Sequence, residues 1–247
     1  MSKKKPSVSM FEYKPELKKA LVVVAHPDDI DFGCAGTVAT LTAHGVEVVY
    51  CLVTSGDAGG DASTHTKEER AAIRESEQTN AARVVGVQTL EFLHYADGTV
   101  EPTLQLRKDI SRVIRKHQPD LVITQSPERN WERIYGSHPD HMAAGEATVR
   151  AVYPDARNPH AFPELLQEGF QPHTVPELWI TGLNPTMAVD ITEQFDKKIE
   201  ALRQHESQVG HREDLRALIK DWAKRTSKSF GLPKGTLVEA FKVVNTK

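Results

Sequence analysis

The chain is poor in the residues that build disulfide-stabilised or membrane-spanning proteins. Only two of its 247 residues are cysteines, and neither Cys34 nor Cys51 has the nearby cysteine of a thiolate metal site, so we expect buried free thiols. No apolar run reaches the roughly 18 residues of a membrane-spanning helix, and none follows the lysines at residues 3–5 as a secretory signal requires. These absences predict a cytoplasmic protein without a membrane span.

A strong net charge is also lacking. The formal charge is −3, so the chain has no global positive field for nucleic acid, and no nucleic-acid partner is expected. With 39% hydrophobic and 26% charged residues, the chain has enough apolar side chains for one large core. We expect an N-terminal tail over residues 1–18 and a single domain over residues 19–247.

Segments typical of strands and helices alternate along the first part of the chain. Short apolar runs predict strands at 21–24, 46–53, 89–93 and 121–124, and longer segments predict helices at 33–44, 67–85, 104–117 and 138–152. The helix at 67–85 is expected to bury its alanines and valines. This alternation predicts an α/β fold, a Rossmann-like and mostly parallel sheet with helices on both faces in a three-layer α/β/α arrangement. The site of such a sheet lies beyond the carboxyl ends of its strands.

The second part of the chain is less regular. Residues 153–176 hold five of the prolines, so we expect an ordered, lid-like loop there. Further strands are predicted at 178–181, 187–191 and 237–244, and further helices at 193–208 and 214–224.

Two short motifs carry the residues with chemical potential. HPDD at residues 26–29 follows the first predicted strand, and HPDH at residues 138–141 opens a helix. Each motif offers one ligand and a second ligand three residues later, and a parallel sheet brings both to one edge. Three nitrogen or oxygen ligands with an open fourth position are typical of catalytic Zn²⁺. One zinc ion per chain is therefore the expected cofactor, although similar sites accept other divalent metals.

Together these motifs resemble those of the LmbE-like (PIG-L) family of zinc-dependent N-deacetylases. The resemblance is carried by AHPDD at 25–29, followed by glycines 33 and 36, and by HPDH at 138–141, and it extends over nearly the whole chain. That family includes enzymes that act on N-acetylglucosamine conjugates such as GlcNAc-phosphatidylinositol. The resemblance implies a metal-dependent amide hydrolase that removes the N-acetyl group from a small amidosugar or glycoconjugate.

The resemblance also implies roles for five residues. His26, Asp29 and His141 would be the zinc ligands. Asp28 would be the general base, which agrees with a carboxylate placed beside water whose pKa zinc lowers to about 7. His138 would stabilise the oxyanion or protonate the leaving amine.

Supporting roles are expected for five more residues. Asp140 is assigned to the catalytic group because a carboxylate there would orient His138 or another imidazole. The candidate substrate-binding residues are Asp57, Arg74, Asp97 and Tyr135. Each has a structural alternative: the acids are common in turns, and Arg74 fits an ion-pairing residue on a helix surface.

Some positions depart from the family pattern or stand alone. Ile30 occupies the position where the family commonly has glutamate, and Asp31 follows it, so the acid is either displaced by one residue or lost. The isolated histidines His44, His117 and His205 are expected to cap helices or to lie at the surface.

Two other functions remain open. A zinc hydro-lyase acting on an unsaturated dicarboxylic acid would need arginines near the metal, and Arg129, Arg133 and Arg157 are available. Amidase cleavage of a larger conjugate is a variant of the same hydrolysis. A nucleotide-binding module is disfavoured, because the first strand lacks GxGxxG and its acidic turn would repel a pyrophosphate. Assembly into a homo-oligomer is left open.

Overall fold

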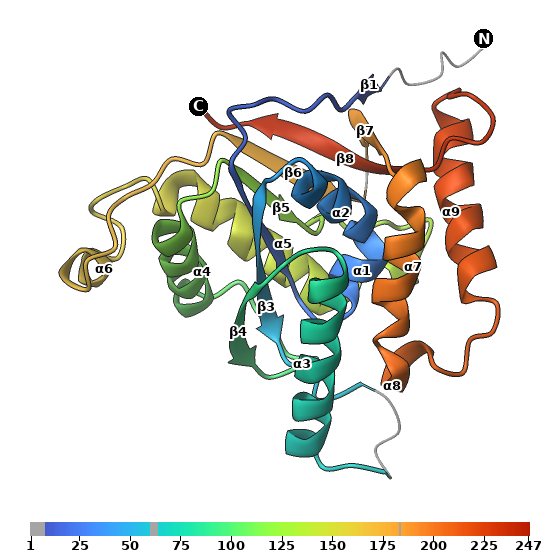
Figure 1. The fold of residues 1–247 in the computed structure, drawn as a ribbon. Helices are drawn as coiled ribbons and strands as arrows, with labels where there is room; N and C mark the ends of the chain where they lie inside the picture. Colours follow the sequence, from blue (N-terminus) through green and yellow to red (C-terminus); the bar gives the residue numbers. More distant parts are fainter. Residues whose placement is uncertain (1–7, 60–63, 183) are drawn as a thin grey trace.

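The computed structural model describes residues 8–59, 64–182 and 184–247, which form one eight-stranded sheet flanked by helices (Figure 1). The strands are β1 (Ser9–Met10), β2 (Lys19–Val24), β3 (Glu47–Thr54), β4 (Thr89–Tyr95), β5 (Leu121–Thr124), β6 (Glu177–Thr181), β7 (Met187–Asp190) and β8 (Val238–Asn245). Their order across the sheet is β1-β7-β8-β6-β5-β2-β3-β4. Only β8 among them runs antiparallel to its neighbours, β6 and β7, so the predicted mostly parallel sheet is confirmed.

Helices cover both faces of the sheet, as predicted. The helices are α1 (Asp29–Gly33), α2 (Ala35–Ala43), α3 (Lys67–Val84), α4 (Leu104–His117), α5 (Pro139–Arg150), α6 (Pro163–Gln167), α7 (Phe195–Arg203), α8 (Glu206–Val209), α9 (Leu215–Ser229) and the short η1 (Ile134–Gly136), η2 (Ala151–Asp155) and η3 (Thr192–Gln194). One apolar core joins the sheet to α2, α7 and α9, and a second joins its other face to α4 and α5. Within the described residues, none of these helices is long and apolar enough to cross a membrane.

Strand β2 is the centre of the fold. Residues 20–24 are fully or almost fully buried, because helices pack on both faces of this β-branched run. Cys34 and Cys51 are buried free thiols, as expected. On one side β2 pairs with β3, and on the other with β5. The order of the strands therefore reverses between β2 and β5, so the loops that follow these two strands diverge and leave space for a site.

The expected N-terminal tail is partly structured. Ser9 and Met10 pair with Met187 and Ala188 as the edge strand β1, so this part of residues 1–18 belongs to the sheet. The backbone N–H groups of Ser9 and Phe11 donate hydrogen bonds to the carbonyls of Thr186 and Ala188. Sequence periodicity does not reveal such pairing of a short extended segment. Residues 1–7 lie outside the described part of the chain.

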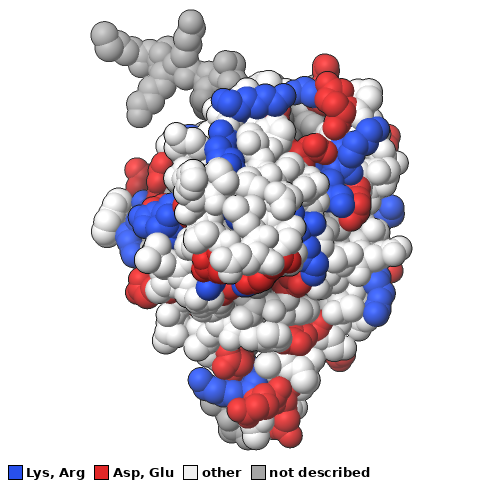
Figure 2. All heavy atoms as spheres, turned by 90° about the vertical axis from the view of Figure 1, so that its left-hand side faces the viewer, with Lys and Arg blue, Asp and Glu red and all other residues white. Residues whose placement is uncertain are grey.

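The proline-rich segment 153–176 does not lie over the site, so the expectation of a lid is wrong. It contains α6 and is anchored to α4 by the buried Arg115, whose guanidinium donates hydrogen bonds to the carbonyls of Ala156, Asn158 and Ala161. It leads from the C-terminal end of α5 to the start of β6. This lies at the amino ends of the parallel strands, whereas the two HPD motifs lie at their carboxyl ends. On the side that carries α4 and α6, basic and acidic side chains are interspersed (Figure 2).

A buried ion pair connects three parts of the chain behind the site. The carboxylate of Glu239 on β8 accepts hydrogen bonds from the first backbone N–H groups of α2, those of Gly36 and Thr37, at 3.1 and 2.7 Å. Lys198 on α7 donates to Glu239 at 2.5 Å and to the carbonyl of Phe32 at 2.7 Å. The Glu239 carboxylate thus lies at the partly positive N-terminus of α2, and the ammonium group of Lys198 neutralises its charge.

We predict that Lys198→Met lowers the free energy of unfolding by about 3–5 kcal/mol, because Glu239 would remain buried without a cation. Both side chains are almost fully buried, with 3% and 6% of their surface exposed. Urea unfolding of the variant measures the loss, and the exposed neighbour Lys197→Met provides the matched control. Equal stability of the two variants would show that the pair contributes nothing.

Candidate metal site

The two HPD motifs meet at the point where β2 and β5 end. The backbone N–H of Ala25, directly after β2, donates to Oε1 of Gln125, directly after β5, at 2.9 Å. His138 is the N-cap of α5, and Pro139 starts that helix with its φ angle already helical. The Nδ1 atom of His138 accepts a hydrogen bond from the backbone N–H of Asp140 at 3.2 Å, which orients its ring.

Three side chains from the two motifs bring donor atoms to one point. The Nδ1 atom of His26 lies 3.2 Å from Nε2 of His141 and 3.3 Å from Oδ2 of Asp29, and Oδ1 of Asp29 lies 3.0 Å from Nε2 of His141. Ligands at 2.0–2.2 Å from one tetrahedral ion would lie about 3.3–3.6 Å apart. The donor set and its spacing therefore fit a divalent metal ion.

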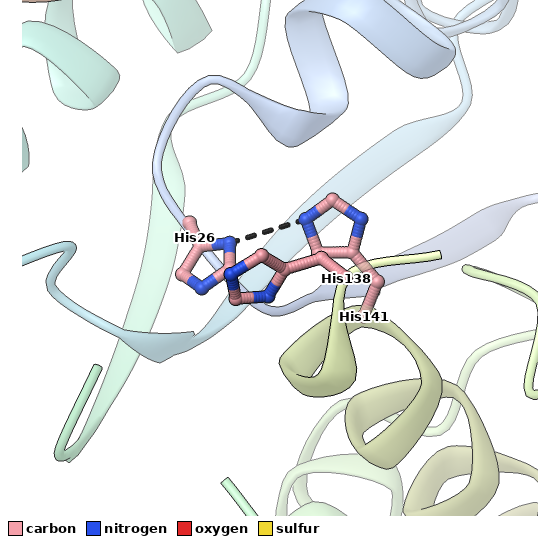
Figure 3. A group of neighbouring side chains, drawn as sticks. All are labelled: His26, His138 and His141. Atoms are coloured by element: carbon pink, nitrogen blue, oxygen red, sulfur yellow. Dashed lines mark hydrogen bonds between the residues drawn. The ribbon is translucent and has the colours of Figure 1, made fainter. Parts of the chain in front are cut away.

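A third imidazole faces the same point. The rings of His26 and His138 lie at right angles, with 5.0 Å between their centroids, and the rings of His138 and His141 lie 5.2 Å apart (Figure 3). These three histidines also satisfy the geometry of a metal-binding group. The predicted ligands His26, Asp29 and His141 therefore lie next to the predicted catalytic His138.

Two carboxylates hold the outer nitrogen of His26. Its Nε2 lies 3.0 Å from Oδ1 of Asp97 and 3.2 Å from Oδ2 of Asp140. The backbone N–H groups of Gly98 and Val100 donate to Asp140, which is itself fully buried. A proton on Nε2 leaves Nδ1 of His26 free to bind a metal, the arrangement usual for metal-ligating histidine. Asp140 therefore faces His26 rather than His138.

The acidic surroundings favour a cation. Burial lowers the pKa of His26, but hydrogen bonds and charges from Asp29 and Asp97 outweigh burial and raise it to about 10. Burial also opposes the charge of Asp29, yet His141 and His26 hold its pKa well below the usual range. Burial and the neighbouring His26 and His141 lower the pKa of His138. The carboxylates that stabilise a proton on His26 would equally stabilise a divalent ion.

The predicted base, Asp28, is held in a strained turn. Its φ angle is +82°, in the left-handed region that costs a non-glycine residue about 1–2 kcal/mol. Its N–H donates to Oε1 of Gln78 at 2.8 Å, and Arg74 donates to its Oδ2 at 3.1 Å and to the carbonyl of Pro27 at 2.6 Å. Burial and the charge of Asp29 raise the pKa of Asp28 to about 6.

The structural alternative for the substrate-binding candidate Arg74, an ion-pairing residue on a helix surface, is wrong because its side chain is only 5% exposed. It also donates to the carbonyl of Gly56 at 3.1 Å, and a Cβ atom on Gly56 would lie 2.2 Å from its guanidinium. The glycine in the loop after β3 thus makes room for the arginine. Helix α3 buries Arg70, Arg74 and Gln78, which lie four residues apart, in addition to the expected Ala81 and Ala82. That spacing places the three side chains on one face of the helix, but a polar face does not by itself indicate burial.

The acid that the family commonly has at the position of Ile30 is displaced by one residue, to Asp31. Ile30 is fully buried in the apolar core, whereas the Asp31 carboxylate accepts a hydrogen bond from Nε2 of Gln78 at 2.9 Å and lies 2.8 Å from Nε2 of His205. Gln78 therefore connects Asp31 to the backbone of Asp28. His205 is the N-cap residue of α8, as expected of a helix cap, but the expectation that it lies at the surface is wrong, because it is fully buried between α7 and α8.

The other candidates lie at the margin of the cluster. Asp57 accepts a hydrogen bond from the N–H of Asp97 at 3.2 Å and lies 3.7 Å from Lys67, so it supports a turn; the end of its loop, residues 60 and 61, lies outside the described residues. Asp97 itself is engaged by His26 and by the N–H of Ala58. Tyr135 is 81% exposed, and no hydrogen bond of its hydroxyl is found in the described structure.

A cavity of about 280 Å³ opens beside His141. Its lining comprises Gln125, Ser126, Glu128, Asn130, Arg133, Gly136, Ser137, His141, Met142, Thr181 and Gly182. It lies between the loop after β5 and the end of β6. The cavity therefore adjoins the metal site through His141.

The chain is similar to known deacetylases. Residues 21–152, more than half of the chain, match the family model for "GlcNAc-PI de-N-acetylase". Diacetylchitobiose deacetylase from Thermococcus kodakarensis is 34% identical over 78% of this chain and 71% of its own length. A "Probable N-acetyl-alpha-D-glucosaminyl L-malate deacetylase 2" from Bacillus anthracis is 31% identical over 77% of this chain and 81% of its own length.

A solved structure supports the same assignment. N,N'-diacetylchitobiose deacetylase from Pyrococcus horikoshii, in complex with its inhibitor MPG, superposes with a TM-score of 0.85 at 30% identity, covering 94% of this chain and 85% of that one. Sequence match, fold and the paired HPD motifs coincide in the same part of the chain. The chain therefore belongs to the PIG-L (LmbE-like) family.

Proposed function

We propose that this protein is a zinc-dependent N-deacetylase that removes the acetyl group from an N-acetylglucosamine-type sugar or glycoconjugate. The observation that carries the proposal is the convergence of donor atoms from His26, Asp29 and His141 within 3.3 Å of one another. The relatives are named for deacetylation of such sugars, which supports the substrate class.

The proposed roles follow from the contacts of each side chain. His26, Asp29 and His141 would hold the ion, which when bound supplies a Lewis acid that polarises the amide carbonyl and makes water more acidic. Asp28 accepts the proton of the attacking water, and Arg74 and Gln78 hold Asp28 in place.

His138 would act on the other side of the amide. Because its Nδ1 accepts the N–H of Asp140, its proton lies on Nε2, which can donate to the developing oxyanion or to the leaving nitrogen. A positioned donor of this kind typically lowers the activation free energy by about 3–4 kcal/mol. Asp97 and Asp140 orient His26 as positioning residues.

The hydro-lyase alternative finds less support in the site. Of the three arginines considered for a dicarboxylic acid, only Arg133 lines the cavity beside His141. Arg129 lines a different hollow, and Arg157 contacts the carbonyl of Thr246 at the opposite edge of the sheet. Amidase cleavage of a larger conjugate would use the same residues.

The test is acetate release from N-acetylglucosamine and its conjugates by the purified protein. We expect about one zinc per chain, loss of acetate release after chelation, and recovery when zinc is returned. The same chelated and reconstituted samples are offered an unsaturated dicarboxylic acid. Full acetate release by metal-free protein would refute the proposed mechanism, and hydration of the diacid without deacetylation would favour the hydro-lyase.

A further inference from the structure

Arg133, in the loop after β5, is placed by aromatic rings. Its guanidinium carbon lies 5.4 Å from the centroid of the Tyr135 ring and 5.9 Å from that of Trp222 on α9. In the described part of the chain, this guanidinium has neither a carboxylate partner nor a hydrogen bond. The rings therefore favour one position for an exposed positive charge whose N–H groups remain available.

The same arginine lines the cavity that contains His141. The cavity is otherwise polar, with the hydroxyls of Ser126 and Ser137 and the amide of Asn130 among its lining groups. Its one lining carboxylate among the described residues, Glu128, lies 3.8 Å from the Nζ atom of Lys242 on β8. A nearby cation thus offsets that negative charge, and Arg133 remains the cation of the cavity wall.

A guanidinium with free N–H groups suits one chemical class of ligand. Its planar set of donors matches the oxygens of a carboxylate or a phosphate and can bind two of them at once. A neutral sugar hydroxyl would use one donor and leave the charge without a counter-ion. Arg133 and His141 line the same cavity. When the amide of a substrate lies at the metal site, an anion bound to Arg133 therefore belongs to the part of the substrate that does not react.

We propose that Arg133 selects N-acetylglucosamine conjugates whose aglycone carries a carboxylate or a phosphate. This inference rests on the proposed deacetylase function and adds the charge of the substrate. Tyr135 and Trp222 act as positioning residues for the guanidinium. Tyr135, a predicted substrate-binding residue, thereby acts on substrate choice through Arg133.

The test compares three substrates that differ in the charge of the aglycone. They are N-acetylglucosaminyl L-malate, N-acetylglucosamine 1-phosphate and neutral N,N'-diacetylchitobiose. We expect Arg133→Ala to raise KM about 10- to 100-fold for an anionic substrate and to change KM for diacetylchitobiose less than about threefold, with kcat nearly unchanged in both cases. The comparison of malate with phosphate identifies which anion is preferred.

Arg129→Ala is the matched control. Arg129 belongs to the same loop and also stacks on a tryptophan, with 5.6 Å between its guanidinium carbon and the Trp131 ring, but it lines a hollow that does not include His141. This variant should keep the wild-type preference. An equal change for neutral and anionic substrates in Arg133→Ala, or no change for either, would overturn the inference.

A binding measurement separates this inference from the deacetylase proposal. Calorimetry with glucosaminyl L-malate and with glucosamine 1-phosphate, which need no reaction, should show affinity at least about tenfold lower in Arg133→Ala than in Arg129→Ala for the preferred anion. Absence of acetate release from all three substrates would refute the deacetylase, while calorimetry would still decide the role of Arg133. Wild-type protein that binds neither anionic sugar would overturn the inference even if diacetylchitobiose is deacetylated.

Discussion

Replacing Asp28 by asparagine is expected to lower kcat by about 10²- to 10⁴-fold and to leave the metal content unchanged, because the amide cannot accept the proton of the attacking water. The substitution is conservative for the fold. Asparagine tolerates the left-handed backbone that Asp28 adopts, at φ +82°, and its side-chain oxygen can still accept the hydrogen bond from Arg74. Steady-state kinetics and metal analysis of the same sample measure both quantities.

The control for this variant is Asp221→Asn, which removes an exposed carboxylate on α9 that pairs with Arg225. It should retain wild-type kcat and metal content. Thermal unfolding shows whether the Asp28 variant keeps the wild-type fold. If folded, metal-loaded Asp28→Asn turned over at a near-normal rate, another group would have to be the base. Loss of metal along with activity would instead indicate that Asp28 supports the ligands.

Replacing His141 by alanine is expected to remove the metal and with it all measurable turnover. His141 supplies one of three donors, and its Nε2 lies 3.2 Å from His26 and 3.0 Å from Asp29. Loss of a group that merely orients a ligand typically costs 10- to 100-fold in metal affinity, so loss of the ligand itself should cost more than about 100-fold. Zinc content after dialysis against a weak chelator measures the affinity.

His138→Ala is the matched variant that separates a ligand from a catalytic group. The ring of His138 lies as close to His26 as that of His141, with 5.0 and 5.1 Å between centroids, so proximity does not distinguish them. We expect His138→Ala to keep its zinc and to lose kcat. Equal loss of zinc from both variants would make His138 a ligand and would require a different oxyanion donor. Retention of zinc by His141→Ala would exclude the proposed ligand set.

Local patterns in the sequence were sufficient for the layers of the fold and for the centre of the site. The β-branched run of β2 is buried on both faces, and the ends of β2 and β5 are adjacent because parallel strands deliver their carboxyl ends to one edge. Two HPD motifs on those loops therefore had to meet. The edge strand β1 was missed because two residues show no periodicity.

The surroundings of Asp28 could not be predicted in the same way. Arg74 and Gln78 lie on one face of α3, where a charged or polar pattern ordinarily indicates solvent, and they are buried because the β2 turn offers them the carbonyl of Pro27 and the N–H of Asp28. His205 is buried for a similar reason, since Asp31 lies 2.8 Å away. Buried polar groups need partners, and those partners come from remote parts of the chain.

The sequence by itself determined the alternating strands and helices of the parallel sheet near the site and the two ligand-bearing motifs, because these depend on residues close to one another in the chain. Only the tertiary structure decided which carboxylates orient His26, that Arg74 is buried beside Asp28, and that Arg133 lies between Tyr135 and Trp222 in front of the cavity. Apart from the contact between Arg133 and Tyr135, these join segments tens of residues apart. Hydrophobic periodicity reports burial of apolar groups, and it carries no information on which distant polar groups satisfy one another.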